Sequence, residues 1–305
     1  MKPNCFIVGA PKCATTALAE YLAKHPSVYL SPQKEPMFWC TDVGAGRHEM
    51  RPRNVAEYEA LFRHADPAKH RVVLEASTGY LRSDVAVVRL LDYASEARMI
   101  AMVRDPVEVA HAFHMEQVYV GLEPERDFER AWRLQDERAA GSSVPEGTSA
   151  DQLMYRDVAA LGSQLTRLFA RVPDGQRMVL LQEDLRTDPD TALGAVLEFL
   201  CLTNADDLVL ESLHGARVQR FPTVAQFVLH PPAPLARPIR ALRLGLLQHP
   251  RIPGVAMVKR FARRDQGRDL LRREFEDALR SHFAPEVERL EALLDRDLAH
   301  WKRVD

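Results

Sequence analysis

Residues 4–24 read NCFIVG, then APKCATT, then ALAEYLAK, and this stretch decides the fold of the chain. The run at 4–9 is short, apolar and closed by glycine, which is typical of a buried parallel strand. Residues 16–24 repeat apolar side chains at helical spacing until a His-Pro pair closes the pattern. The chain therefore opens as strand, turn and helix. Such a turn is a ready anion site, because the first amides of a helix have no intrahelical acceptor and the helix dipole favours negative charge there.

The side chains of the turn add to this preference for anions. Gly9 and Ala14 let a ligand approach the backbone, Thr15 and Thr16 carry hydroxyl donors, and Lys12 supplies a mobile positive charge. The order of residues differs from that of a nucleotide-triphosphate loop, since the lysine comes early and no Gly-Lys-Ser/Thr follows. The pattern for binding magnesium is therefore not met. A plain helix start is the alternative, but it does not need a lysine in the turn.

Further apolar runs alternate with helical patterns along the chain. Strands are expected at 28–30, 72–75, 99–103 and 178–182, and helices at 55–64, 85–93, from 107 onward, 155–171, 191–200, 266–282 and 285–301. This alternation predicts an α/β fold with a parallel sheet and helices on both of its faces. Ligands in such sheets bind at the carboxyl ends of the strands, where three polar clusters fall, at 11–16, 75–80 and 104–106. We expect one domain over residues 1–305.

Composition excludes several classes of protein. The 305 residues carry a net charge of −2 and are 46% hydrophobic, which is typical of a globular protein and not of a dedicated nucleic-acid binder. The four cysteines have no zinc-ligand spacing and indicate reduced thiols. We find neither a signal peptide nor a run of about 18 apolar residues, so we expect a cytoplasmic protein without a transmembrane segment.

The segment 212–264 differs from the rest, with ten Arg or Lys residues and no Asp or Glu. It also holds a proline-rich run at 230–238. It is either a solvated loop or a flap that closes over an anionic ligand, and we favour the flap because a long loop without clear structure is usually functional or disordered.

Residues 6–18 (FIVGAPKCATTAL) resemble the 5′-phosphosulfate loop of the sulfotransferases that use 3′-phosphoadenosine 5′-phosphosulfate (PAPS). The likeness is greatest to the branch of the heparan sulfate sulfotransferases and their bacterial relatives. Further stretches fit in order, at 25–39, 75–80, 103–110, 178–200 and 283–301. The resemblance implies a P-loop-NTPase-like fold. It also implies transfer of a sulfuryl group to an acceptor hydroxyl, less often an amine, of a small molecule, lipid or saccharide.

The resemblance also implies roles for particular residues. The backbone of Lys12, Cys13, Ala14, Thr15 and Thr16 would cradle the 5′-phosphosulfate, and Lys12 would stabilise the leaving group without any metal. Glu35 stands where the branch keeps its general base; the alternative is a loop glutamate paired with its neighbouring lysine. Arg104 would hold the 3′-phosphate; the alternative is an ion pair with Asp105.

Departures from the family pattern affect two parts of the site. Ala112 stands where the family has a serine for the 3′-phosphate and Val109 stands where it has an arginine, so Arg217 and Arg220 of the acid-free segment become candidates to complete that site. Ala76 and Met37 replace a lysine and a histidine of heparan-type members, which argues against a polyanionic acceptor.

Two other readings of the chain stay open. One is a kinase or NTPase on the same sheet, which would need magnesium. The other is a non-catalytic nucleotide-binding relative, which the alanine at 112 keeps possible. His111 and His114 are spaced i, i+3 without a third ligand, so we expect them to be packing or surface residues and not metal ligands. The oligomeric state stays open.

Overall fold

The computed structural model describes residues 1–44, 51–203, 217–219, 263–265 and 270–303. The chain divides into two compact units. The first consists of Met1–Ala110, Met154–Leu213 and Arg272–Asp305, and the second of His111–Leu153 and His214–Leu271. Each is described by itself, and the expectation of a single domain over the whole chain stays a prediction.

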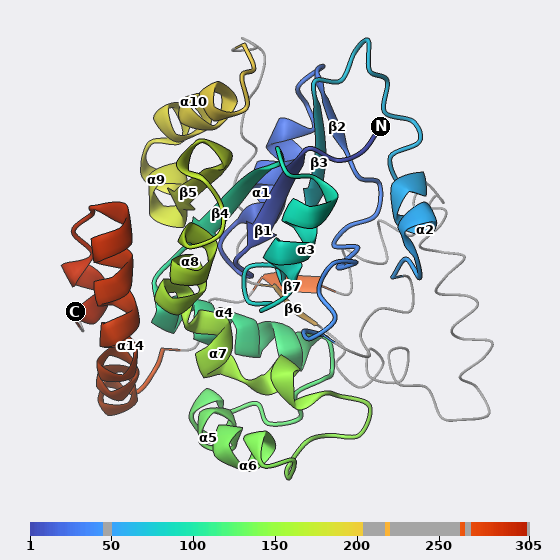
Figure 1. Cartoon of the computed structure of the whole chain (residues 1–305). Coiled ribbons are helices and arrows are strands. Elements are labelled where there is room, and N and C mark those ends of the chain that lie inside the picture. Colours follow the sequence, from blue (N-terminus) through green and yellow to red (C-terminus); the bar gives the residue numbers. More distant parts are fainter. Residues whose placement is uncertain (45–50, 204–216, 220–262, 266–269, 304–305) are drawn as a thin grey trace, which may run out of the picture. The chain divides into compact units, whose positions relative to one another are not determined.

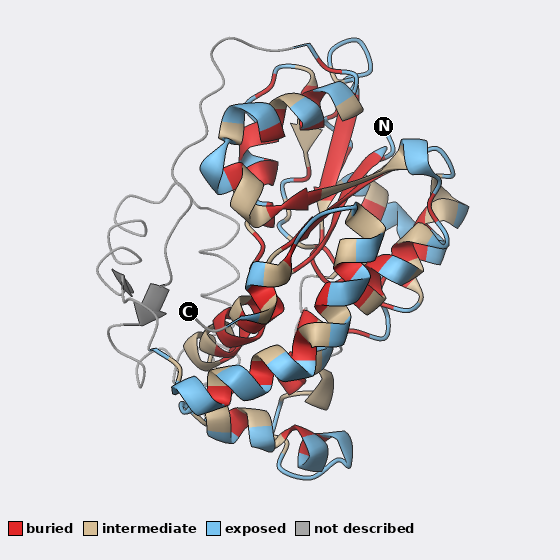
Figure 2. Cartoon of the chain, turned by 90° about the vertical axis from the view of Figure 1, so that its left-hand side faces the viewer, coloured by how far each residue is buried: buried red, intermediate tan, exposed pale blue. Residues whose placement is uncertain are grey.

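The first unit is built on a five-stranded sheet in the order β2-β3-β1-β4-β5. Its strands are β1 (Cys5–Gly9), β2 (Val28–Leu30), β3 (Val72–Ala76), β4 (Arg98–Val103) and β5 (Arg177–Leu181), and every pairing is parallel. All of β1 is buried, as are the last five residues of β4. Figure 2 shows these central strands in the colour of buried residues. The predicted parallel sheet is confirmed, with strand bounds within one residue of the expected ones.

Helices flank this sheet on both faces, as Figure 1 shows. The first unit contains α1 (Thr15–Leu22), α2 (Val55–Ala60), α3 (Ala86–Tyr93), α7 (Tyr155–Ala159), α8 (Leu161–Phe169), α9 (Gln182–Thr187), α10 (Pro189–Phe199) and α14 (Arg273–Leu294), with short 3-10 turns η2 (Asp174–Gln176) and η3 (Ala299–Lys302). The arrangement is the P-loop-NTPase-like α/β fold expected from the sequence. Among the described residues, no helix combines the length and the hydropathy needed to span a bilayer.

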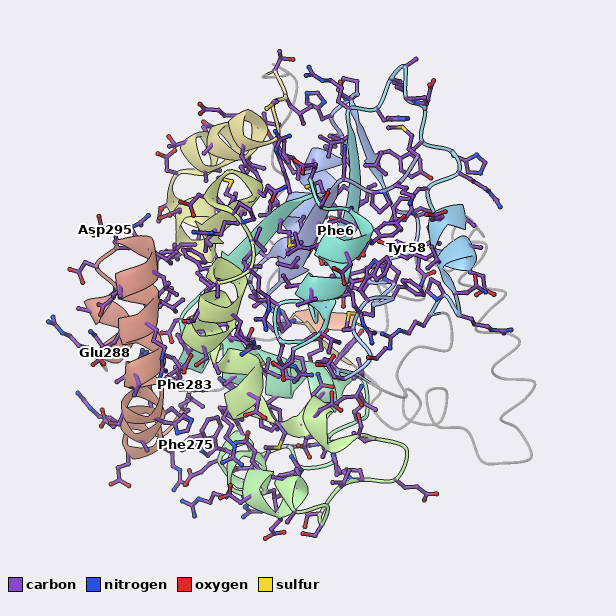
Figure 3. The ribbon with its side chains drawn as sticks, in the orientation of Figure 1. Phe6, Tyr58, Phe275, Phe283, Glu288 and Asp295 are labelled. Atoms are coloured by element: carbon purple, nitrogen blue, oxygen red, sulfur yellow. The ribbon has the colours of Figure 1, made fainter. Side chains whose placement is uncertain are left out.

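Several helix predictions were wrong in their bounds, and two of them have a clear structural reason. The expected break at Pro285 does not occur, because α14 runs through it and keeps burying Phe275, Leu279, Phe283, Val287 and Leu290 on one side. This apolar spacing continues across the proline, so packing holds both halves in one helix. Figure 3 labels Phe275 and Phe283, from the buried side, and Glu288, which is exposed.

The second correction concerns residues 155–171, which form α7 and α8 instead of one helix. Ala160 separates them with φ −74° and ψ 56°, outside the helical region.

The second unit begins within α4 (Pro106–Tyr119) and continues through α5 (Phe128–Arg133), α6 (Gln135–Ala139) and η1 (Ala150–Leu153). Arg138 and Glu123 form a buried two-pronged ion pair, with N–O distances of 2.7 and 3.0 Å. The rings of His111 and His114 both pack on Phe128 at 5.1 Å between centroids. The expectation that these histidines pack is confirmed.

Most of the acid-free segment lies outside the described residues. Only the backbone of β6 (Arg217–Gln219) and β7 (Arg263–Asp265) is described, as an antiparallel pair. The flap therefore stays a prediction.

Helices α8 and α14 approach each other so closely at Gly162 that we expect any side chain there to be destabilising. A Cβ atom on Gly162 would lie 2.3 Å from the backbone oxygen of Glu286, so Gly162→Ala should lower the free energy of unfolding by about 1–3 kcal/mol. Gly194 in α10 is the matched control, because a Cβ there meets nothing within 4 Å. Gly194→Ala should be neutral or stabilise by up to about 1 kcal/mol, since alanine is the better helix former. Urea unfolding of both variants measures the difference, and equal effects would contradict this account of the helix contact.

Candidate active site

The turn between β1 and α1 has the geometry of an anion site. Lys12 and Ala14 adopt left-handed backbone conformations, with φ of 65° and 69°. Ala14 is the N-cap of α1, and no side chain caps this helix. In the part of the chain that the structure describes, the backbone amides of Lys12, Cys13, Ala14, Thr15 and Thr16 have no acceptor. The helix start therefore presents uncapped donors, as the sequence predicted.

The side chains of this turn differ in their exposure. Lys12 is half-buried and Thr16 is exposed, whereas Thr15 and Cys13 are buried. Burial raises the pKa of the Cys13 thiol to about 12, so this thiol stays protonated at neutral pH. The Cys13 side chain is therefore a packing group of the turn, whereas Lys12 and Thr16 stay accessible to solvent.

Arg104 follows β4 and is linked to the same turn. Its Nη1 donates to the carbonyl oxygen of Lys12 at 3.3 Å, and the rest of the guanidinium pairs with Glu108 one helical turn later. The alternative ion pair with Asp105 does not form. Asp105 instead accepts from Arg280 of α14 at 2.9 Å and caps α4 through the amide of Val107 at 2.8 Å.

Glu35 lies on the segment after β2 and meets the turn after β3. Its Oε2 accepts a hydrogen bond from the Thr78 hydroxyl at 3.2 Å. Glu35 and Met37 are both left-handed, with φ of 49° and 54°. The sequence alone did not show that the regions around 35 and 78 meet; only the family resemblance grouped them.

The turn after β3 also lies against the end of β1. The amides of Ser77 and Leu81 donate to the carbonyls of Ile7 and Val8 at 3.1 and 2.7 Å. A Cβ atom on Gly9 would lie 2.6 Å from the Cβ of Leu81 and 3.0 Å from the Thr78 oxygen, so only glycine fits here. The turn that contacts Glu35 is thus attached to the strand that leads into the anion turn.

A second carboxylate lies beneath this arrangement. Glu75, on β3, is fully buried and accepts from the hydroxyls of Tyr80 at 2.8 Å and Tyr58 at 3.2 Å. Figure 3 shows Tyr58 on the side of α2 nearer the sheet. Burial raises the pKa of Glu75 to about 7, although the hydroxyls of Ser77, Tyr80 and Tyr58 oppose the rise.

Comparison with known proteins gives a consistent result. No protein-family model matches the chain. It is 25% identical over 198 residues to the bifunctional heparan sulfate N-deacetylase/N-sulfotransferase 3 of Homo sapiens, and 28% identical over 106 residues to the membrane-associated sulfotransferase kil1 of Dictyostelium discoideum. The crystal structure of a sulfotransferase from Alicyclobacillus acidocaldarius is 25% identical and superposes with a TM-score of 0.71, covering 99% of this chain and 100% of that one.

The chain is similar to sulfotransferases both in sequence and in fold. The first curated match includes 65% of this chain but only 22% of the human protein, and the second includes 35% and 21%. This chain thus corresponds to only about a fifth of each of those longer proteins.

The residues expected to contact the nucleotide or to depart from the family pattern differ in their surroundings. Arg220 lies outside the described residues, and of Arg217 only the backbone in β6 is described. Val109, which stands where the family has an arginine, is fully buried and carries no charge for a phosphate. Ala112 offers no polar group. Met37 is buried, and its Cε would be 2.2 Å from a Cβ on Gly79, so it belongs to the core.

Sequence reasoning missed Glu75 as a residue of the site. The signal was present, because a glutamate at the end of the apolar run VVLEA places a charge where charges are rare unless paired. The partners Tyr58 and Tyr80 were not recognisable as such. Among the described residues, no group of three His, Cys, Asp or Glu side chains could hold a metal ion.

Ala14 provides a test of the anion turn. An alanine in the left-handed conformation is strained by about 1 kcal/mol relative to glycine, so Ala14→Gly should raise the free energy of unfolding by up to about that amount. Ala17→Gly, three residues further into α1, is the control and should lower it by about 1 kcal/mol. Thermal and urea unfolding report both signs, and a destabilising Ala14→Gly would show that the turn is not strained at this position.

The pKa of Glu75 predicts how stability depends on pH. The folded pKa of about 7 lies above the ordinary carboxyl pKa of 4.5, so the folded state holds a proton that the unfolded state has released between these values. The stability contributed by this proton is complete below pH 4.5 and is lost as the pH rises to about 7, with a slope of up to about 1.4 kcal/mol per pH unit. Glu75→Gln removes this titration. Its stability relative to the wild type should therefore increase from pH 5 to pH 8 in urea unfolding, and a constant difference would exclude the raised pKa.

Proposed function

We propose that this sulfotransferase moves a sulfuryl group from PAPS to a hydroxyl, or less often an amine, of an acceptor. The observation that supports this most is the pairing of two elements. One is an uncapped helix start with Lys12 in its turn, and the other is the carboxylate of Glu35, positioned by the turn attached to the same strand.

The amides of residues 12–16 fit a 5′-phosphosulfate, because they offer donors without acceptors at the positive end of a helix. When bound, PAPS supplies an activated sulfuryl group whose transfer leaves negative charge on the bridging phosphate oxygen. Lys12 meets this charge with a flexible ammonium that needs no proton transfer. The residues therefore act through position and charge, as expected for a transfer without a covalent enzyme intermediate.

Glu35 is the proposed general base. It would take the proton of the acceptor as its oxygen or nitrogen attacks sulfur. The hydrogen bond from Thr78 holds one carboxylate oxygen of Glu35 in place. Because the carboxylate is planar and rigid, this also sets the direction of its other oxygen. Such fixed orientation is what proton transfer to a side chain requires.

The 3′-phosphate is the weaker part of the proposed site. Arg104 adjoins the anion turn through the carbonyl of Lys12, but Glu108 already offsets its charge. Ala112 offers no polar group either, so Arg217 and Arg220 remain the residues that we propose for the 3′-phosphate. The weaker site also keeps a non-catalytic nucleotide binder as the alternative function.

We propose an acceptor smaller or less charged than heparan sulfate, which the name of the human relative specifies for that protein. Position 37 is a buried methionine and position 76 an alanine, so neither offers the cation that would contact a polyanionic sugar chain. A small molecule, a lipid or an uncharged saccharide is consistent with these residues.

Calorimetric titration tests the donor site. We expect 3′-phosphoadenosine 5′-phosphate to bind at least about tenfold more tightly than 5′-AMP or ATP with magnesium, because a second phosphate adds charge-assisted hydrogen bonds. Lys12→Ala should weaken bisphosphate binding, whereas Lys24→Ala, outside the turn, should not. Equal binding of 5′-AMP, or preference for ATP with magnesium, would exclude the proposed donor.

Labelled PAPS and an acceptor library test the catalytic roles. Glu35→Gln should keep bisphosphate affinity and lower the transfer rate by about 10²–10⁴, the range typical of a lost general base. Gln33→Ala serves as the control on the same segment and should retain transfer. Binding without transfer by the wild type would favour the non-catalytic alternative.

A further inference from the structure

The segment that contains Glu35 is held in an unfavourable backbone conformation. Glu35 and Met37 are left-handed at φ 49° and 54°, a region that residues other than glycine rarely adopt. Such conformations persist only where the surroundings fix them. The groups that fix this segment therefore decide where the Glu35 carboxylate lies.

Two hydroxyl groups hold the backbone of this segment. The amide of Met37 donates to Ser77 Oγ at 2.9 Å, and the amide of Trp39 donates to Tyr80 Oη at 3.5 Å. Each hydroxyl that accepts in this way also has one O–H group, which needs an acceptor of its own. Tyr80 is fully buried, and its hydroxyl donates a hydrogen bond to Glu75 Oε2 at 2.8 Å.

Glu75 is thus the acceptor at the centre of the network. Its Oε2 receives the hydroxyls of both Tyr80 and Tyr58, and the rings of Tyr58 and Phe38 stack at 4.8 Å. The network consequently reaches the segment after Glu35 through two amides and one aromatic contact. It begins from a single carboxyl group.

We propose that Glu75 is a positioning residue, which orients the Tyr80 and Tyr58 hydroxyls and thereby holds residues 35–39 so that the Glu35 carboxylate stays in place. The expected effect of Glu75 on the transfer rate rests on the proposed function, whereas its expected effect on the order of residues 35–39 does not. Glu75 does not touch substrate, because its side chain is fully buried beneath Tyr58, Ser77 and Tyr80.

The chemistry of the carboxyl group distinguishes between replacements. A carboxyl oxygen accepts hydrogen bonds whether or not the other oxygen is protonated, so titration of Glu75 does not release the tyrosines. Glutamine keeps an acceptor oxygen of similar shape. Leucine keeps the volume but leaves two buried hydroxyls without an acceptor, which is the more disruptive change.

Hydrogen–deuterium exchange of peptides covering residues 33–40 tests the structural part without any ligand. In Glu75→Leu we expect exchange of this segment to be about tenfold faster than in the wild type, the effect of losing roughly one net hydrogen bond. Glu75→Gln should restore the slow exchange. Tyr80→Phe should resemble Glu75→Leu, and it also serves as the test if the leucine variant does not fold.

Tyr93→Phe is the matched control. Tyr93 packs on the same Trp39 at 4.6 Å, but its hydroxyl bonds to Glu59 and not to Glu75. Exchange of residues 33–40 should be unchanged in this variant. Unchanged exchange in both Glu75→Leu and Tyr80→Phe, or equally fast exchange in Tyr93→Phe, would overturn the proposal.

Transfer kinetics separate this proposal from the proposed function. If both hold, Glu75→Leu lowers kcat by about 10- to 100-fold with bisphosphate affinity unchanged, and it has little further effect in a Glu35→Gln background. A wild type that transfers no sulfuryl group while the exchange pattern holds would refute the function and leave the positioning role. A wild type that transfers the sulfuryl group, together with variants whose exchange is unchanged, would refute the positioning role alone.

Discussion

The amide of Leu81 donates to the carbonyl of Val8 at 2.7 Å, and around this bond the turn after β3 packs on the end of β1. The contact needs glycine at position 9, because any larger residue would strike Leu81 and the Thr78 carbonyl. From β1 the chain runs directly into the anion turn. From the turn after β3, Thr78 reaches Glu35. The candidate cation and the candidate base are therefore tied to neighbouring strands through one close backbone contact.

Left-handed backbone occurs in two loops that the turn after β3 connects, namely the turn after β1 and the segment after β2. Of the non-glycine residues with positive φ in the described chain, Lys12, Ala14, Glu35 and Met37 belong to these loops. Each loop also has a polar anchor, from Arg104 to the carbonyl of Lys12 and from the amide of Met37 to Ser77. Strained backbone held by buried polar anchors is typical of sites where orientation matters more than stability.

The fold was accessible from the sequence because buried parallel strands read as apolar runs, and VVLEA and RMIAMV stand out between polar turns. The failure at Pro285 has a tertiary cause, since the packing of Phe283 and Val287 overrides the local preference to break. The Arg104–Glu108 pair was readable in principle from its i, i+4 spacing. The network of Glu75 was not, because Tyr58 comes from α2, 17 positions away, and nothing in its own surroundings marks it as a partner.

The buried carboxyl of Glu75 also shows why the site could not be read from charged motifs alone. A sequence pattern identifies groups that touch a ligand, since those must carry a given charge at a given spacing. Glu75 accepts hydrogen bonds from tyrosine and serine hydroxyls, and its proposed effect on Glu35 passes through the amides of Met37 and Trp39. Those amides are present whatever the side chains at 37 and 39 are. A residue that acts through another residue's backbone leaves no mark at the position it controls, so only the folded arrangement connects the two carboxylates.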